Sequence, residues 1–367
     1  MPKKYERYFV YCALLLTGIG IVFIYSASSY WAKVQYPDAV PFYLKQAIYI
    51  GIALFMFFLI RNKNLNNKKL WQMLYIISLL LLVAVLIPGI GVERNGSRSW
   101  IDLKVFTLQP AELVKITTLM LLSYQLAAWK RHQRIIQLRH FVTIFLPVIL
   151  IMLQPDFGSA FILVVSSFIL LFIANYPIKF YIIVIFFGVI GGIIAIISAP
   201  YRLKRITAFL DPWSDPLGSG FQAVQSLLAI GPSGMWGQGF LESRQKYLYL
   251  PEPQNDFIFS IILEEVGFVG GVVIVCIFAC FLYFGFRLAL TSIHNQSFYV
   301  MAGLTAMLTI QIALNIGVVV GVLPVTGVTL PFISYGGTSL VLTWLVVSII
   351  YSFSIEQKRR GNNGKNY

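Results

Sequence analysis

The feature that most constrains this chain is a series of ten long stretches that contain few charged residues. The hydrocarbon core of a bilayer is about 30 Å thick, and roughly 20 apolar residues cross it as a helix. The stretches lie at residues 8–27, 45–60, 71–89, 112–129, 140–153, 157–174, 179–199, 256–286, 298–322 and 336–355. The fifth is short and contains Pro147. The sequence therefore predicts an all-α polytopic membrane protein with ten transmembrane helices.

The composition supports a membrane protein. Only 11% of the residues are charged and 58% are hydrophobic, whereas about 25% of the residues in a soluble domain are charged. So few charges cannot cover a soluble globule of 367 residues. Cys12, Cys276 and Cys280 lie in apolar stretches and predict no disulfide framework. We expect the first stretch to be retained as a helix and not removed as a signal peptide.

The basic residues predict the orientation, because cytoplasmic loops carry an excess of Lys and Arg. With the N-terminus inside, the alternate loops and both termini hold 17 of the 28 basic residues and two of the 14 acidic residues. This favours an N-in, C-in topology. The net charge of +14 is then a topology signal and predicts no nucleic acid partner. The predicted organisation is one transmembrane domain, 1–355, followed by a basic cytoplasmic tail, 356–367.

Residues 200–255 form a large extracellular loop between the predicted helices 7 and 8. Its Trp, Tyr, Leu and Pro content indicates a structured loop, and loops of this length are usually functional. Residues 221–230 have apolar side chains at helical spacing, with Gly231 as a plausible stop. The expected apolar face is Phe221, Val224, Leu227 and Leu228, with Gln222, Gln225 and Ser226 opposite. We interpret this as an amphipathic helix at the membrane interface; a structural cap over the bundle is the alternative.

Five basic residues lie on the non-cytoplasmic side of this prediction: Arg202, Lys204, Arg205, Arg244 and Lys246. The positive-inside tendency does not favour that location. An anionic partner such as a diphosphate head group is one explanation. Contact with ordinary lipid phosphates is the other, and composition does not choose between them.

Carboxylates occur at the start and inside the eighth stretch. Asp256 would lie in the first turn, where the helix dipole favours a carboxylate. Glu264 and Glu265 lie deeper, where carboxylates are costly and are functional candidates by default. These two residues are expected either to pair with bases on other helices or to hold the helix in register.

The fourth stretch opens with Gln109-Pro110-Ala111-Glu112, and Lys115 follows one turn later. Proline at a helix start and an acid in the first turn are typical N-terminal signals. At a spacing of three residues Glu112 and Lys115 are expected to neutralise one another. Contact between Lys115 and a lipid phosphate is the alternative.

The last loop, residues 323–337, has no charge, two prolines and three glycines. Non-helical backbone near membrane depth is found where protein buries it or where it lines a cavity. After Gly336 and Gly337 the last helix would offer free N–H groups to an anion; a packing hinge is the alternative. His132, His140 and His294 are expected to be solvated, and no Cys/His metal cluster is present in the sequence.

Several motifs together resemble the SEDS family, which comprises FtsW, RodA and SpoVE. They are Asn95-Gly96-Ser97-Arg98-Ser99-Trp100, Gln109-Pro110-Ala111-Glu112, Leu210-Asp211-Pro212-Trp213, Gly220-Phe221-Gln222, Gln225-Ser226-Leu227, Tyr249-Leu250-Pro251-Glu252 with Asp256-Phe257-Ile258-Phe259, and Leu330-Pro331-Phe332-Ile333-Ser334-Tyr335-Gly336-Gly337. The resemblance covers almost the whole chain and is greatest to the FtsW/SpoVE branch of Gram-positive spore-forming bacteria. Asn255 stands where Thr is common in the family.

The resemblance implies a peptidoglycan glycosyltransferase that polymerises lipid II during cell division or spore cortex synthesis. It also implies a class B penicillin-binding protein as partner, with other divisome or sporulation membrane proteins. The family's essential Asp falls on Asp256, and we expect it to act as the general base of an inverting reaction. The expected substrate-binding residues are Arg98, Lys115, Arg202, Arg205, Lys246 and Glu252, with a divalent cation (Mg²⁺ or Mn²⁺) as a further candidate.

Two other functions fit the same sequence. A lipid II flippase would use the ten spans, the charges of Lys115 and Glu264, and the broken last loop as a lipid pathway. A non-catalytic scaffold of the division machinery would not require Asp256.

Overall fold

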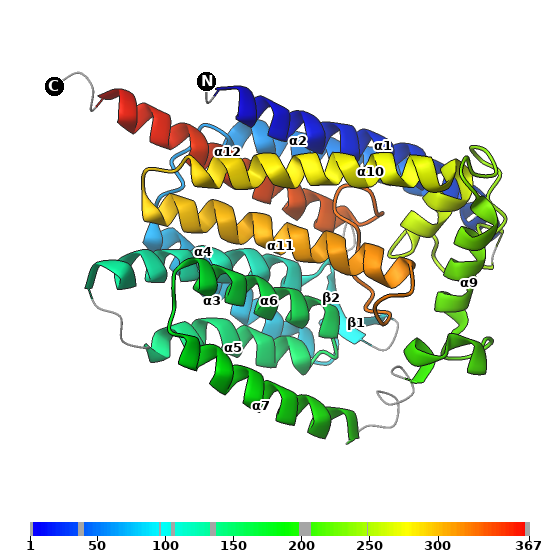
Figure 1. Ribbon diagram of the computed structural model, residues 1–367, viewed down its shortest axis with the longest axis horizontal. Coiled ribbons are helices and arrows are strands. Elements are labelled where there is room, and N and C mark those ends of the chain that lie inside the picture. Colours follow the sequence, from blue (N-terminus) through cyan, green and yellow to red (C-terminus); the bar gives the residue numbers. More distant parts are fainter. Residues whose placement is uncertain are drawn as a thin grey trace.

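The computed structural model describes residues 3–35, 40–94, 97–103, 107–132, 137–197, 207–247 and 249–363. In these ranges ten helices coincide with the ten predicted stretches and form one bundle (Figure 1). They are α1 (Lys3–Gln35), α2 (Phe42–Ile60), α3 (Lys68–Leu86), α4 (Pro110–His132), α5 (Leu138–Met152), α6 (Phe157–Ile173), α7 (Ile178–Ile197), α10 (Ile258–Leu290), α11 (Asn295–Val319) and α12 (Gly337–Asn363). Both termini lie at one end of the bundle (Figure 1).

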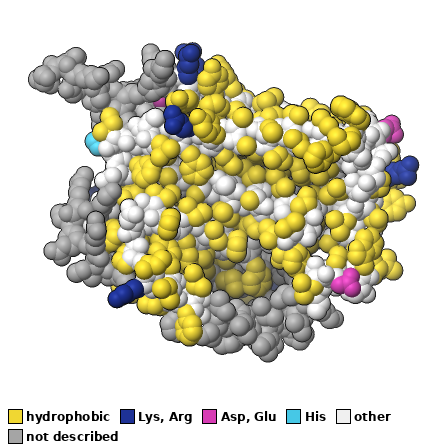
Figure 2. Space-filling model, viewed as in Figure 1, with side chains coloured by type: hydrophobic (Ala, Val, Ile, Leu, Met, Phe, Trp, Pro, Cys, Tyr) yellow, Lys and Arg dark blue, Asp and Glu magenta, His cyan; other side chains and the backbone are white. Residues whose placement is uncertain are grey.

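Within the described residues, six helices are long and apolar enough to cross a membrane: α1, α2, α3, α10, α11 and α12. Helices α5 and α6 are apolar but shorter. Helix α4 carries more polar residues because α3, α6 and α11 surround it, and its side chains from Val114 to Leu126 are all buried. Figure 2 shows a lateral face that is mostly hydrophobic, with the charged side chains toward the two ends.

The proline inside α5 has a partner helix that compensates for it. Pro147 has no N–H, so the carbonyl of Thr143 one turn earlier loses its helical hydrogen bond. The hydroxyl of Tyr75 on α3 donates to that carbonyl at 3.0 Å. Because lipid offers no donor, this contact lets α5 keep Pro147 at membrane depth.

The prediction that the histidines are solvated is wrong for His140. Its side chain is fully buried at the start of α5, and its Nδ1 lies 3.1 Å from the hydroxyl of Tyr176. The ring of Trp129 packs at a right angle against the imidazole. Trp129 near the end of α4 and Tyr176 in the connection between α6 and α7 therefore enclose His140, although its place in the sequence, next to a predicted loop, suggested exposure.

The end of the bundle opposite the termini, which we call the loop end, carries a small sheet that the all-α prediction missed. Its strands are β1 (Gly91–Arg94), β2 (Ser97–Asp102) and β3 (Thr107–Leu108), in antiparallel order β1-β2-β3. Gly91 pairs with Ile101, and Ile101 pairs with Leu108. The strands are too short to give an alternating hydrophobic pattern, and they pack on α3 and α4.

The described part of the long loop, 207–247 and 249–255, is structured, as predicted. It contains a helical turn at 207–210, η1 (Pro212–Ser214), α9 (Phe221–Ile230) and η2 (Gly231–Ser233). The bounds predicted for α9 are confirmed, and Val224 of the predicted apolar face is buried. Leu228 of the same face is 42% exposed, and Ser226, expected on the polar face, is buried. The Ser226 hydroxyl donates to the carbonyl of Val319 at 2.8 Å. Helix α9 thus lies across the end of α11, where terminal carbonyls need donors.

Helix α10 is broken at Gly267, which has φ 67°. Segment 234–239 fills the break by hydrogen bonding to the helix backbone. The contacts are Phe268 N to Gly234 O, Val269 N to Met235 O, Gln238 N to Glu264 O and Gly239 N to Glu265 O, at 2.9–3.1 Å. A β-carbon on Gly267 would lie 2.3 Å from the nitrogen of Gly237, so only glycine permits this approach.

Candidate active site

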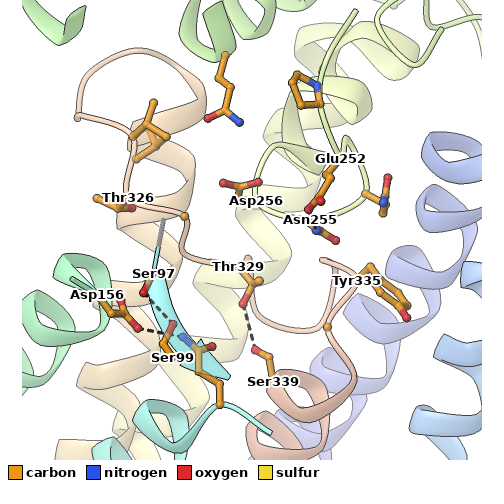
Figure 3. Close-up of a pocket in the computed structure, with 18 of the residues that line it drawn as sticks. Ser97, Ser99, Asp156, Glu252, Asn255, Asp256, Thr326, Thr329, Tyr335 and Ser339 are labelled. Atoms are coloured by element: carbon orange, nitrogen blue, oxygen red, sulfur yellow. Dashed lines mark hydrogen bonds between the residues drawn. The ribbon is translucent and has the colours of Figure 1, made fainter. Parts of the chain in front are cut away.

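A cleft of about 1780 Å³ opens at the loop end of the bundle. Its walls come from α2, the sheet, segment 208–227, segment 251–256 and segment 321–339. Figure 3 shows carboxylate and hydroxyl side chains from several of these segments around one space. Since the walls are distant in sequence, the cleft forms only when the bundle has assembled.

Asp256 projects into the cleft from the turn that precedes α10 (Figure 3). Removal from water and the nearby Glu252 carboxylate raise the pKa of Asp256 to about 6, although main-chain hydrogen bonds act in the opposite direction. A carboxyl group with this pKa is mostly ionised at neutral pH and accepts a proton more readily than an ordinary Asp. These properties suit a general base.

A tight turn presents Asp256. Glu252 has φ 44°, and the main-chain N–H of Asn255 donates to its carbonyl at 3.0 Å. The side-chain amide of Asn255 donates to the Glu252 carboxylate at 2.6 Å. The carbonyl of Gln254 accepts from the main-chain N–H of Tyr335 at 2.8 Å, so the turn is attached to the last loop.

Two amides on α11 hold the last loop. Asn315 Nδ2 donates to the carbonyl of Asp256 and to that of Val328, both at 2.7 Å. Gln311 Nε2 donates to the carbonyl of Thr329 at 3.2 Å. The acid turn and the last loop are therefore fixed against one helix.

The prediction that segment 323–337 is buried or lines a cavity is confirmed, because much of it lines the cleft. The hydroxyls of Thr329 and Ser339 lie 3.0 Å apart (Figure 3). The Thr326 hydroxyl is buried and has no hydrogen-bond partner among the described residues. It is a polar group available to a ligand.

The opposite wall is ordered by Asp156. One of its oxygens accepts from the N–H of Ser159 at 3.0 Å and caps α6. The other accepts from the side-chain amide of Gln109 at 2.9 Å. Nearby, the hydroxyls of Ser97 and Ser99 on β2 lie 2.9 Å apart. Both oxygens of Asp156 are engaged, so its position indicates a structural role.

Most charges that line the cleft are negative. Among the described residues, the charged side chains in the lining are Lys45, Asp102, Asp156, Glu252 and Asp256. The predicted ligands Arg202 and Arg205 lie in residues 198–206, outside the described part of the chain. Of the six predicted substrate-binding residues, Glu252 is the one that the described lining includes.

Lys115 is fully buried on α4. Its Nζ lies 2.7 Å from the Glu112 carboxylate and 3.5 Å from the side-chain oxygen of Gln311. It is not among the residues that line the cleft. Its position favours mutual neutralisation with Glu112 over direct contact with a lipid phosphate.

Lys246 also lies away from the cleft lining, in an ion pair with Glu265 at 3.3 Å between the long loop and α10. Ser26 on α1 donates to the same carboxylate. Glu264 accepts from the hydroxyl of Ser243 at 2.5 Å and from the N–H of Arg244 at 2.9 Å. The two carboxylates therefore attach the long loop to α10.

Arg98 on β2 is partly exposed, and its guanidinium lies 4.0 Å from the Glu93 carboxylate. It is absent from the described lining of the cleft, although its neighbours Ser97 and Ser99 belong to it.

A cation site made by protein ligands alone is not present in the described residues, where no three His, Cys, Asp or Glu side chains converge. Mg²⁺ is often held by one or two carboxylates together with substrate phosphates. Glu252, in the lining, fits that mode as the single carboxylate.

Lys45 was missed in the sequence because it opens an apolar stretch and resembles an ordinary helix-end residue. The available signal was its predicted place on the non-cytoplasmic side, which the positive-inside tendency does not favour.

The fold and the cleft define a multi-pass membrane protein with a carboxylate of raised pKa in a cleft at one end of its bundle. The FtsW/RodA/SpoVE profile, described as cell cycle protein, matches residues 6–359. The chain is 42% identical over 351 residues to stage V sporulation protein E of Bacillus subtilis, covering 94% of this chain and 95% of that protein. It is 36% identical over 358 residues to the probable peptidoglycan glycosyltransferase FtsW of Saccharophagus degradans, covering 96% and 92%. The chain belongs to the FtsW/RodA/SpoVE family.

Two solved structures of similar proteins have the same overall fold. A chain from a peptidoglycan synthase complex, studied for the structural coordination of polymerisation and crosslinking, superposes with a TM-score of 0.78 at 31% identity, covering 95% of this chain and 97% of that one. The rod shape determining protein RodA of Thermus thermophilus gives a TM-score of 0.67 at 27% identity, covering 95% and 96%.

Proposed function

We propose that this protein is a peptidoglycan glycosyltransferase that polymerises lipid II at the outer face of the plasma membrane. The names of the FtsW relatives support this activity over nearly the whole chain. The observation that carries the proposal is the Asp256 carboxylate, with its raised pKa, in a cleft of about 1780 Å³. Small-molecule pockets are usually about 300–1,000 Å³, so this cleft has room for two sugar-bearing substrates.

In the proposed reaction Asp256 accepts the proton of the acceptor 4-hydroxyl as that oxygen attacks the anomeric carbon of the donor. The bond from this carbon to the diphosphate breaks, and the diphosphate leaves with the electron pair. Attack from the opposite face inverts the configuration, so an α-linked donor gives a β-1,4 linkage, by analogy with inverting glycosidases.

Glu252 has a supporting part in this proposal. Its carboxylate accepts from Asn255 and raises the pKa of Asp256 by repulsion between like charges. A base of higher pKa removes the acceptor proton more effectively, provided that it remains ionised at the working pH.

The departing diphosphate needs positive charge. We retain Arg202 and Arg205 as candidates because they precede segment 208–227, which lines the cleft. A divalent cation held by Glu252 and the phosphates would add electrostatic stabilisation of the diphosphate and would leave Asp256 free to accept the proton.

We further propose that all ten long helices cross the membrane, with both termini in the cytoplasm. A class B penicillin-binding protein that crosslinks the new strand is the proposed partner, in division or sporulation. Similarity to a chain of a peptidoglycan synthase complex supports a partner of this kind.

The alternative function, lipid II transport, was suggested by the charges of Lys115 and Glu264, and their contacts give it less support. Lys115 is paired with Glu112, and Glu264 accepts from the long loop. Neither residue offers a free charge along a lipid pathway, so we favour the enzyme over the flippase.

The test is lipid II polymerisation by the chain reconstituted with its transpeptidase partner. Wild type should form glycan, and Asp256→Asn should lose at least about 100-fold in rate, the usual scale for a general base. Glu242→Gln is the matched control, because Glu242 is exposed and outside the lining. Undiminished polymerisation by Asp256→Asn would overturn the assigned base. Translocation of fluorescent lipid II without polymerisation would favour the flippase.

A further inference from the structure

Lys45 is a cation of the cleft that the proposed reaction leaves without a role. It lies in the first turn of α2, is partly buried, and is the basic residue that the described lining contains. Its Nζ lies 5.9 Å from the ring centre of Phe42. Among the described residues no carboxylate forms an ion pair with it.

The location of Lys45 is unfavourable unless an anion is nearby. The N-terminal end of a helix carries partial positive charge, which repels a lysine in the first turn. This turn of α2 has no acidic residue, and its N-cap residue Pro41 makes no side-chain capping bond. An anion in the cleft beside Lys45 would neutralise the lysine charge and would also interact favourably with the partial positive charge of the helix end.

A stripe of apolar side chains follows Lys45 along α2. Ile48, Tyr49 and Ile52 follow at three, four and seven residues, hence on the same face of α2, and all three line the same cleft. Ile48 is 61% exposed and Ile52 is 45% exposed. At 1.5 Å per residue, the stripe runs about 10 Å from the cation along the helix.

The other side of this groove is the start of α12. A β-carbon on Gly337 would lie 2.4 Å from the ring of Tyr49, so the absence of a side chain lets the helices approach. Gly336 and Gly337 line the cleft beside this ring.

Lys45 is held in a defined position relative to the acid turn. The side-chain amide of Gln46 lies 3.5 Å from the carbonyl of Ser334, and the ring of Phe42 packs edge-on against Tyr335 at 4.8 Å. The N–H of Tyr335 in turn donates to the carbonyl of Gln254. Two contacts therefore connect the helix of Lys45 to the turn that carries Asp256.

We propose that Lys45 binds the diphosphate of a lipid-linked substrate, and that Ile48, Tyr49 and Ile52 bind the first isoprenoid units. A positive charge followed by a hydrophobic track matches an anion joined to an unbranched apolar chain. This proposal rests on the proposed function, which supplies the identity of the sugar that the lipid carries. In the glycosyl transfer, α2 would then hold the leaving diphosphate and its lipid chain.

The test measures binding of undecaprenyl diphosphate, which carries no sugar, to the full chain in nanodiscs. Lys45→Gln should weaken binding at least tenfold, Lys45→Arg should retain it within threefold, and Ile52→Asn should weaken it several-fold. Lys69→Gln, at the exposed far end of the bundle, is the matched control. Undecaprenol and inorganic diphosphate should each bind at least tenfold more weakly than the joined molecule.

A second measurement needs no variant. In wild-type protein, undecaprenyl diphosphate should protect Lys45 from acetylation by an amine reagent, read by mass spectrometry, and phosphatidylglycerol should not. Equal protection by phosphatidylglycerol, no protection at all, or wild-type affinity of a folded Lys45→Gln would overturn the proposal. Because these readouts are binding, a protein that binds the lipid but makes no glycan would refute the proposed function alone.

Discussion

The side-chain amide of Asn315 on α11 donates a 2.7 Å hydrogen bond to the main-chain carbonyl of Asp256. The same nitrogen donates to Val328 in the last loop at 2.7 Å. Both amide hydrogens are therefore used, and one side chain sets the distance between the acid turn and the loop across the cleft. The position of the turn that carries the Asp256 carboxylate therefore depends on a residue that does not line the cleft.

Asn315→Leu keeps the number and branching of the side-chain heavy atoms and removes both donors, so we expect lower stability and slower polymerisation. Unsatisfied buried carbonyls cost about 1–3 kcal/mol each, and the polymerisation rate should fall further than undecaprenyl diphosphate binding does. Thermal unfolding and initial rates check this. Thr309→Val on the same helix removes only a bond to Thr305 within that helix and should change neither. Equal rates for Asn315→Leu and wild type would contradict the positioning role.

The raised pKa of Asp256 predicts a pH dependence. A base must be ionised, so the polymerisation rate should fall as pH drops through about 6 and level off above it. Glu252→Gln removes a neighbouring negative charge and should shift the midpoint to lower pH. Initial rates of both proteins from pH 5 to 8 check the sign, because a shift to higher pH is the opposite of what charge repulsion gives.

The buried pair of Lys115 and Glu112 predicts non-additive stability changes. Lys115→Met alone leaves a carboxylate beside an apolar side chain, which costs roughly 3–5 kcal/mol for a buried pair. Adding Glu112→Gln should recover most of the loss in thermal unfolding. The double variant should also keep its affinity for undecaprenyl diphosphate. A stable double variant with lost affinity would support the sequence-based prediction that Lys115 binds substrate.

The break in α10 predicts that Gly267 tolerates no side chain. Gly267→Ala adds a β-carbon 2.3 Å from the Gly237 nitrogen at a positive φ, so we expect destabilisation by more than about 2 kcal/mol. Gly18→Ala is the control, because nothing lies within 4 Å of the added carbon. Alanine also favours a helix over glycine by about 1 kcal/mol, so Gly18→Ala should be neutral or stabilising. Similar unfolding temperatures for the two variants would count against a docked segment 234–239.

Local signals in the sequence were sufficient for the helices but not for their partners. Spacing and Gly231 predicted the bounds of α9, because both act within a few residues. The burial of Ser226 was missed because its acceptor, the carbonyl of Val319, is 93 residues away. Lys246 looked like a free base for a related reason, since its partner Glu265 lies on the following helix.

Of the candidate site, the sequence motif singled out the carboxylates of Asp256 and Glu252 and not the other residues around them. Asp256 was identified from the residues around it, and the structure puts it in a cleft. Lys45 was not, because its meaning depends on α2 lying beside the last loop and the acid turn. The small sheet was also missed, since its strands are ordered by packing on α3 and α4 and not by their own pattern.

Glu264 and Glu265 have a further consequence for how the chain is made. Their donors, Ser26 on α1 and residues 243–246, all precede α10 in the sequence. A ribosome therefore releases these donors before the two acids emerge. We therefore expect the hydrogen-bond donors of both carboxylates to be available when α10 enters the bilayer, so that neither carboxylate is buried in lipid without a partner. The direction of synthesis thus assists the insertion of a helix that carries two adjacent negative charges.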